Sequence, residues 1–285
     1  MNEIYPYENN LKKHFVKIDK LNIRAIKNID LIYLINLDQR PEKFERTMGQ
    51  LSTYEIYPNR LPAIYGWTLP NEVFEDVGLK LSQEMNWKGS IYLRQTGVQK
   101  VLQPSYGSAI FYPRMTHGAV GTALSHLSIL QNAYDARAES IWILEDDITV
   151  NADPRCLSEY MERLDSLVGS DGWDILYTDD LTYFEPFTPG TVWRPDMPTM
   201  NFDPLFERND LGRDFYQIGG RCQAHSLIMR RSGIRKILDF AKRHGIYLPY
   251  DIEIAFVPNI RFFNLKHNVV VGGTLENSDT IRRYF

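Results

Sequence analysis

Hydrophobic residues are grouped along this chain in two ways, as short uninterrupted runs and as stripes with helical spacing. The strongest run is residues 29–37, IDLIYLINL, and another, residues 141–144, leads directly into three carboxylates. Apolar, β-branched runs without polar alternation are typical of strands buried on both faces of a parallel sheet. Shorter strands are predicted within residues 60–66, 173–180, 221–229, 261–266 and 268–273.

Apolar residues at helical spacing lie between these runs. Phe44, Met48 and Leu51 follow the i, i+4, i+7 pattern of one buried helix face. Asp38 is placed to cap this helix, with Pro41 in its first turn. Similar stripes predict helices within residues 71–84, 117–138, 154–167 and 232–244. Strands alternating with helices predict an α/β fold with a mostly parallel, Rossmann-like central sheet flanked by helices.

Two long stretches, residues 68–116 and 181–216, carry little periodicity. Such a stretch inside an α/β domain is commonly a lid or substrate loop, although a plain insertion looks the same. No internal repeat or low-complexity linker divides the chain, so we expect a single domain after an N-terminal extension of residues 1–30.

Composition narrows the function classes. The chain has 285 residues, of which 44% are hydrophobic and 24% charged, as in ordinary soluble globular proteins. Its formal net charge of −4 provides no global positive field, so no nucleic-acid partner is expected. Cys156 and Cys222 have no CxxC spacing and fit a reducing compartment. The start, MNEIYPYENN, lacks a secretory layout, so we expect a cytoplasmic location, although a chain trimmed of its signal would look the same.

Residues 11–28 are a basic exception, because lysines and arginines alternate there with apolar residues and almost no acid. A basic amphipathic segment can lie on an anionic membrane surface, which would place the protein peripherally at the inner membrane face. The alternative is a segment whose apolar side packs on the domain and whose basic side faces water.

The chemistry centres on Glu145, Asp146 and Asp147, which end the run at residues 141–144. Three adjacent carboxylates repel one another, and a divalent cation compensates them directly. Open α/β sheets bind ligands at the carboxyl ends of their strands, where this triplet is predicted to lie. The alternative is that these acids are helix caps or solvated loop residues.

Two further segments carry polar groups toward the same edge. The loop after residues 29–37 presents Asn36, Arg40 and, further on, Arg46, which suit phosphate or a base edge, although no GxGxxG fingerprint is present. The helix at residues 117–138 begins with glycines that allow close approach, followed by Ser125 and His126 at the flank of its apolar stripe. A single histidine on a helix is also a common packing residue.

In these stretches the chain resembles glycosyltransferase family 25, the lipopolysaccharide and procollagen galactosyltransferase-like enzymes. The matching segments occur in the family's order: IYLINLDQRPEKFER, RLPAIYG, GAVGTALSH, WILEDDI, LPYD and the SDTIR tail. The resemblance implies a GT-A-type fold, with a nucleotide-sugar half at residues 31–180 and an acceptor half, with loop elaborations, at residues 181–285. It also implies an inverting transferase that uses a UDP-hexose, with galactose or glucose as the sugar and a glycan such as lipopolysaccharide or lipooligosaccharide as the acceptor.

The resemblance also assigns roles to residues. It implies Mn²⁺ or Mg²⁺ bound by Asp147, with Glu145 or Asp146 as a second ligand or ribose contact and His267 as a late ligand, unless His267 is a packing residue. Asp251 is expected to be the general base, with Glu253 and Asp180 as rivals. The donor is expected to contact Asn36, Leu37, Arg40, Arg46, Gly118, Ser125, His126, Glu145, Asp146, Ser278 and Asp279.

Three other functions remain open at this point. The acceptor can be a protein hydroxyl of the hydroxylysine type, or the chain can bind a sugar nucleotide or glycan without catalysis. A metal-dependent phosphohydrolase would pair residues 145–147 with Asp179 and Asp180, and would release phosphate without an acceptor.

Overall fold

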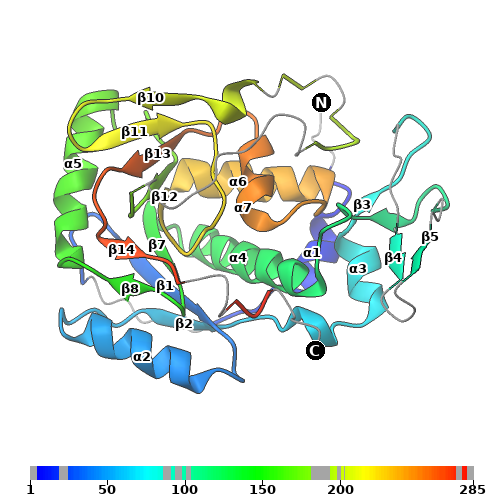
Figure 1. The fold of residues 1–285 in the computed structure, drawn as a ribbon, viewed down its shortest axis with the longest axis horizontal. Coiled ribbons are helices and arrows are strands. Elements are labelled where there is room, and N and C mark those ends of the chain that lie inside the picture. Colours follow the sequence, from blue (N-terminus) through cyan, green and yellow to red (C-terminus); the bar gives the residue numbers. More distant parts are fainter. Residues whose placement is uncertain are drawn as a thin grey trace.

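The computed structural model describes residues 5–18, 25–85, 104–180, 193–197, 200–201, 203–273 and 278–280, and only the backbone of 91–93 and 98–100. Its centre is an eight-stranded sheet in the order β10-β11-β13-β9-β12-β7-β1-β2 (Figure 1). The strands are β1 (Leu31–Asn36), β2 (Asn59–Pro62), β7 (Ser140–Glu145), β9 (Ile175–Tyr177), β10 (Arg208–Asp210), β11 (Phe215–Ile218), β12 (Ser226–Arg230) and β13 (Phe262–Leu265). The sheet is mostly parallel, as predicted, with β11 and β12 running against the other strands.

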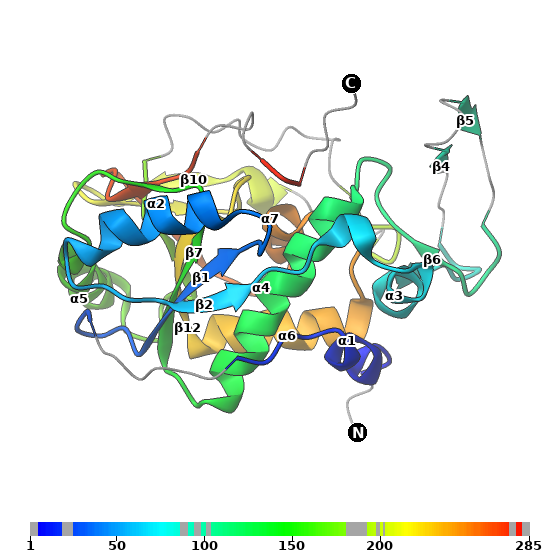
Figure 2. The same ribbon diagram turned by 90° about the horizontal axis from the view of Figure 1, so that it is seen from below.

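Helices cover both faces of this sheet (Figure 2). One face carries α2 (Pro41–Ser52) and α5 (Leu157–Val168), and the other carries α4 (His117–Asp135) and α6 (Arg231–His244). Alternate residues of one strand point to opposite faces, so β1 sends Tyr33 toward α4 and Leu34 toward α2. All six residues of β1 are buried, which is why its sequence shows no polar alternation.

Smaller elements surround this core. They are α1 (Glu8–Lys13), α3 (Asn71–Val77), α7 (Tyr250–Glu253), the 3₁₀ turns η1 (Gly66–Thr68), η2 (Pro154–Cys156), η4 (Asp203–Phe206) and η5 (Ile254–Phe256), and the strand pairs β3 (Leu79–Lys80) with β6 (Ala109–Ile110), β4 (Ile91–Leu93) with β5 (Val98–Lys100), and β8 (Thr149–Val150) with β14 (Val270–Val271).

Strand register decides what meets at the carboxyl edge of the sheet. β1 and β7 are parallel neighbours, with Leu34 opposite Leu144 and Ile35 opposite Glu145. Asn36 therefore lies beside the start of the acidic triplet. The two segments that the sequence marked separately, the first strand–helix loop and the triplet, meet because two buried strands pair in parallel.

Two local expectations need correction. Arg40, not Asp38, occupies the N-cap position of α2, and no side chain caps that helix. Asp38 instead forms an ion pair with Arg60, with 2.6 Å between the carboxylate and Nη2. Residues 208–216, expected to be loop, include β10 and the first two residues of β11. All three residues of β10 are exposed at the sheet edge, so they carry no apolar pattern that would reveal a strand. Residues 181–192 lie outside the described part.

The basic N-terminal segment packs on the domain where it is described. Leu11 is fully buried, and Phe15, Val16 and Ile18 pack against the same core. Val16 also exchanges hydrogen bonds with α4, its N–H donating to Ser128 Oγ at 3.0 Å. Among the described residues the structure thus favours the packed alternative for the apolar side. No helix in the described ranges has the length and hydropathy required to cross a membrane.

The chain does not divide its sheet between residues 180 and 181. β12, from the second half of the sequence, pairs with β7 on one side and β9 on the other. The division into nucleotide-sugar and acceptor halves stays a prediction about function rather than a boundary in the fold.

Candidate functional site

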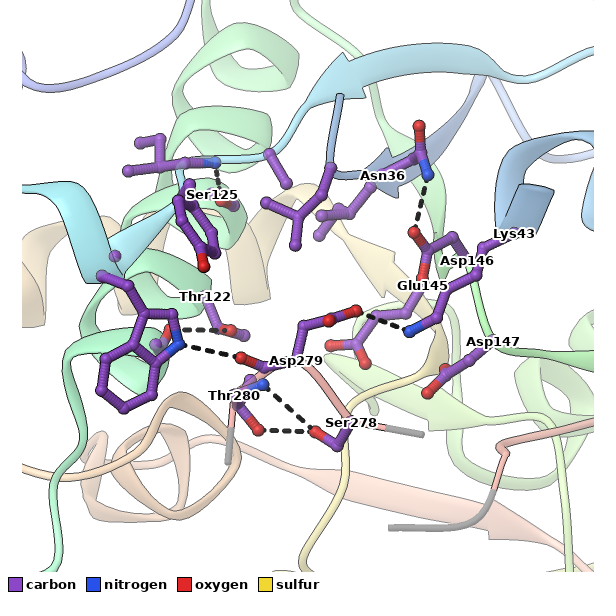
Figure 3. Close-up of a pocket in the computed structure, with 18 residues that line it drawn as sticks. Asn36, Lys43, Thr122, Ser125, Glu145, Asp146, Asp147, Ser278, Asp279 and Thr280 are labelled. Atoms are coloured by element: carbon purple, nitrogen blue, oxygen red, sulfur yellow. Dashed lines mark hydrogen bonds and ion pairs between the residues drawn. The ribbon is translucent and has the colours of Figure 1, made fainter. Parts of the chain in front are cut away.

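Two adjoining cavities lie at the carboxyl edge formed by β1 and β7. The smaller, about 80 Å³, is bounded by the end of β1, residues 63–67, the start of α4 and residues 278–280 (Figure 3). The larger, about 310 Å³, lies between α4, residues 223–225, α7 and residues 272–273. The side chains or backbone that line both are Thr122, Glu145, Asp147, Ser278 and Thr280. The acidic triplet therefore stands at the junction of the two cavities.

Each carboxylate of the triplet has a different environment. Glu145 Oε1 accepts a hydrogen bond of 3.0 Å from His126 Nε2. Asp146 turns toward β1 and accepts a hydrogen bond of 2.7 Å from the Asn36 amide. Asp147 accepts no hydrogen bond from any residue that the structure describes. Asp147 is thus the member of the triplet without a hydrogen-bond donor among the described residues, and the charges of Lys43 and His225 offset its burial and its acidic neighbours only in part.

The electrostatics follow from these environments. Burial, together with repulsion by Glu145 and Asp146, raises the pKa of Asp147 to about 6. Burial opposes ionisation of Glu145 as well, but the hydrogen bond and charge of His126 outweigh it and lower the pKa of Glu145. A cation bound next to Glu145 and Asp147 would therefore stabilise the ionised form of both carboxylates.

The donor atoms here fit a hard divalent cation. Glu145, the last residue of β7, and Asp147, in the turn that follows, line the same two cavities. No three His, Cys, Asp or Glu side chains in the described residues come close enough to hold a metal by themselves. Mg²⁺ and Mn²⁺ fit such an incomplete set, because they commonly take one or two carboxylates and complete their shell with phosphate oxygens and water.

The structure does not bring His267 to this site. Its Nε2 lies 3.1 Å from Asp214, and its ring stacks on Tyr160 with 5.6 Å between centroids. It lines neither cavity, so the packing alternative holds for His267. The histidine that lines a cavity together with Glu145 and Asp147 is His225, whose Nε2 lies 3.1 Å from Asp179. A single histidine before a strand carries no sequence signal that would have identified it.

Arg46, predicted to contact the donor, does not lie at the site, and Lys43 of the same helix does. Arg46 is exposed on the outer side of α2 and lines neither cavity. Lys43 lines the smaller cavity, and Thr47, one turn later on the same side, donates a 2.9 Å hydrogen bond to the backbone of Asp146. The four-residue spacing of Lys43 and Thr47 was the available signal, since it places both on one side of a helix.

Of the other donor residues predicted in the first loop and α4, Arg40 is exposed and lines neither cavity, although its guanidinium pairs with Asp279, which lines the smaller one. Asn36 and Leu37 line the smaller cavity, as does Gly118 at the start of α4. A Cβ at Gly118 would lie 2.8 Å from Thr280, so only glycine permits the observed approach. Ser125 lines the same cavity and accepts a 2.9 Å hydrogen bond from Ile64 N–H, which fixes the loop after β2.

His126 reaches the site only through a neighbour. Its side chain is fully buried, stacks on Tyr250 with 4.1 Å between ring centroids, and contacts Glu145. It lines neither cavity, so its role is to position Glu145.

Asp251 faces the larger cavity from the first turn of α7. One carboxylate oxygen accepts a hydrogen bond of 2.6 Å from Gln223 N–H, and the other accepts one of 3.0 Å from Ile252 N–H. Gln223 adopts a left-handed backbone with φ of 71°, which turns its N–H toward Asp251. Burial raises the pKa of Asp251, while these backbone groups fix the orientation of the carboxylate.

The rivals of Asp251 are used elsewhere. Glu253 accepts backbone N–H groups of Tyr247 and Leu248 and pairs with the buried Arg194. Neither Glu253 nor Asp180 lines either of the two cavities.

The structure does not place Asp179 and Asp180 where a phosphohydrolase would need them. Asp179 forms a buried ion pair with Arg221, with 2.7 Å between Oδ1 and Nη1, and contacts His225. Neither Asp179 nor Asp180 joins residues 145–147 at the cavities. The only acids that share the larger cavity with Asp147 in the described residues are Glu145 and Asp251.

Fold and site together define the class: a GT-A-type, Rossmann-like α/β protein with its cavities at the carboxyl ends of parallel strands. Comparison with known proteins specifies the family. The sequence profile of glycosyltransferase family 25, described as an LPS biosynthesis protein family, matches residues 29–253. This chain belongs to glycosyltransferase family 25.

Curated relatives agree with this assignment. A glycosyltransferase 25 family member from Aedes aegypti is 27% identical over 166 residues, which is 58% of this chain and 23% of that protein. A human protein named inactive glycosyltransferase 25 family member 3 is 26% identical over 149 residues, covering 52% of this chain and 21% of that protein. The matches thus cover about a fifth of relatives that are much longer, and those relatives include proteins described as inactive.

Proposed function

We propose that this chain transfers a hexose from a UDP-sugar, UDP-galactose or UDP-glucose, to a hydroxyl of a glycan, with inversion at the anomeric carbon. The observation that carries this proposal is the position of Asp147, a buried carboxylate with no hydrogen-bond donor among the described residues, beside Glu145 where two cavities meet. A transferase needs such an arrangement, because donor and acceptor must occupy adjoining spaces on either side of the reacting bond. The family description supports lipopolysaccharide as the glycan.

In this proposal the smaller cavity belongs to the donor. Asn36, Lys43, Tyr65 and Trp67 are among the residues that line it. The Lys43 ammonium suits a diphosphate, and the two aromatic residues offer flat faces for a base. A Mn²⁺ or Mg²⁺ ion bound by Asp147 and Glu145 would neutralise negative charge on the departing diphosphate.

The larger cavity belongs to the acceptor, and Asp251 is the general base. Its volume of about 310 Å³ is within the range of small-molecule sites. In a single displacement, the oxygen of the acceptor hydroxyl bonds to the anomeric carbon of the sugar. Asp251 accepts the proton of that hydroxyl. The bond between that carbon and the diphosphate oxygen breaks at the same time, and UDP leaves. The raised pKa of Asp251 suits proton acceptance near neutral pH better than an ordinary carboxylate does.

Asp147→Asn is the test of this proposal. We expect kcat to fall on the order of 100-fold, as when a group that stabilises transition-state charge is removed. The measurement is transfer of labelled galactose or glucose from its UDP donor to a lipooligosaccharide acceptor with Mn²⁺ present.

Asp180→Asn is the matched control, because it makes the same change at another strand end that lines neither cavity. Full turnover by Asp147→Asn would refute the catalytic assignment. Tight donor binding by the unaltered chain with no transfer to any hydroxyl acceptor would identify a non-catalytic relative, as the human protein's name describes for that protein.

A further inference from the structure

Residues 278–280 lie between the two cavities and are tied to two separate parts of the fold. Trp67 Nε1 donates a 3.0 Å hydrogen bond to the backbone oxygen of Asp279, as Figure 3 shows. Thr116 Oγ1 donates a 2.7 Å hydrogen bond to the backbone oxygen of Thr280. The absence of a side chain at Gly118 lets this segment lie directly on the start of α4. The segment is therefore seated in the site by specific contacts.

The Asp279 carboxylate is held by two cations, Lys43, which lines the smaller cavity, and the more exposed Arg40 beside it. Arg40 Nε donates to Asp279 Oδ1 at 2.8 Å, and the Nη2 of the same guanidinium contacts the same oxygen. Lys43 Nζ donates to Oδ2 at 2.7 Å. Burial opposes ionisation of Asp279, but these two partners outweigh it and lower its pKa. An anionic group of this chain thus already occupies the position between Arg40 and Lys43.

The remaining space is too small for the proposed donor. The smaller cavity has about 80 Å³ with residues 278–280 in place, whereas small-molecule sites are usually about 300–1,000 Å³. Guanidinium and ammonium groups bind carboxylate and phosphate oxygens through the same charge-assisted hydrogen bonds. A diphosphate can therefore use the contacts that Asp279 now uses, but it cannot use them at the same time.

We propose that Arg40 and Lys43 form the subsite for the donor diphosphate, and that Asp279 occupies this subsite until the diphosphate displaces it. This inference rests on the proposed function, which assigns a nucleoside diphosphate sugar to the smaller cavity. Asp279 is then an internal competitor, and apparent donor affinity is reduced by the fraction of molecules in which it is seated. A segment that closes over a bound donor would have the opposite effect, since its removal would weaken binding.

Calorimetric binding of UDP and of inorganic pyrophosphate, both with Mg²⁺, tests the inference. Asp279→Asn removes the competing charge with little change of shape, and we expect it to lower both dissociation constants on the order of fivefold, the scale of one partly exposed ion pair. Glu42→Gln is its control, since Glu42 also lies near Arg40, at 3.8 Å, but is exposed and lines neither cavity.

Lys43→Gln and Arg46→Gln form the second matched pair. Removing a charged hydrogen-bond donor from the subsite should raise both dissociation constants about tenfold or more, whereas the exposed Arg46 should not matter. Amide hydrogen exchange shows whether ligand binding displaces residues 278–280 or closes them over the ligand. With saturating UDP, the backbone amides of Asp279 and Thr280 should exchange faster if the segment is displaced, and slower if it closes over the ligand.

The outcomes separate this inference from the proposed function. UDP binding that weakens in Asp279→Asn, or slower exchange at residues 279–280, overturns the displacement inference and leaves the donor assignment standing. Pyrophosphate binding with the expected variant pattern but no UDP binding supports the subsite and contradicts the UDP donor. Absence of binding by either probe to the unaltered chain and to Asp279→Asn overturns both.

Discussion

Single carboxylates in this protein have their roles set by what donates to them. Asp251 receives a backbone N–H on each oxygen, from Gln223 and Ile252, so its orientation is fixed without any neutralising charge. Glu253, two residues later, accepts a backbone hydrogen bond and forms an ion pair with Arg194. Two carboxylates within one short helix thus have different roles, and only their tertiary contacts distinguish them.

Asp251→Asn should therefore affect the chemical step and spare donor binding. An asparagine keeps the shape but cannot accept the hydroxyl proton, and loss of a general base typically costs about 10²–10⁴-fold in kcat. Steady-state kinetics with a UDP-hexose and a glycan acceptor measure kcat, and calorimetry measures UDP affinity.

Asp203→Asn, at an exposed position outside both cavities, controls for the substitution. Unchanged kcat in Asp251→Asn would reassign the base. A parallel loss of UDP affinity would show that Asp251 shapes the donor site instead.

At the scale of elements, the edge of the sheet opposite the site is held by one buried acid. Asp174, at the start of β9, accepts hydrogen bonds from Ser232 and Lys236 of α6 and from Arg261 before β13. Burial alone would raise the pKa of Asp174, but these donors outweigh it, and the pKa is lowered. The network ties α6 to the neighbouring strands β9 and β13.

Asp174→Asn should destabilise the fold by about 3 kcal/mol, because it leaves the cations of a largely buried ion-pair network uncompensated. The pH dependence has a defined sign. A pKa that is lower in the folded state gives stability that is fully present above the unfolded value of about 3.9 and is lost as pH falls through the folded value.

Guanidinium unfolding between pH 7 and pH 3 measures this effect. The unaltered chain should lose stability below about pH 4, and Asp174→Asn should lose less over the same interval. Asp171→Asn, exposed and three residues earlier, should match the unaltered chain. Equal pH slopes for the unaltered chain and Asp174→Asn would contradict the assigned role.

Strands buried on both faces could be predicted from the sequence, and the exposed edge strand could not. β1 and β7 were identified because burial on both faces demands uninterrupted apolar residues. β10 was missed because its residues are exposed, so nothing in its sequence distinguishes it from a loop. α3 ends at Val77, short of the helical stripe expected through residue 84, because the chain turns into β3.

At the scale of the whole molecule, the site exists because distant segments meet at one sheet edge. The first loop, the start of α4, the triplet, the turn before β12, α7 and residues 278–280 all contribute to two connected cavities. Ligand binding there should therefore stabilise the entire fold, since the unfolded chain has no such site.

A thermal-shift panel of UDP-, GDP- and CMP-sugars, each with and without Mn²⁺, measures that stabilisation. At 100 times its dissociation constant, a ligand adds about 2.7 kcal/mol to the free energy of unfolding. We expect the largest rise in melting temperature with a UDP-hexose plus Mn²⁺, and little rise with Mn²⁺ alone. A larger metal-dependent shift with a GDP- or CMP-sugar would change the donor assignment.

The sequence by itself determined the buried strands, the helices with clear stripes and the place of the acidic triplet after β7, because burial and strand termini leave local patterns. Tertiary structure decided which side chains reach the cavities: Lys43 rather than Arg46, and His225 rather than His267. It also decided that Asp279 sits between Arg40 and Lys43. These choices depend on the rotation of a helix and on the pairing of residues more than 200 positions apart, and no local pattern of residues encodes either.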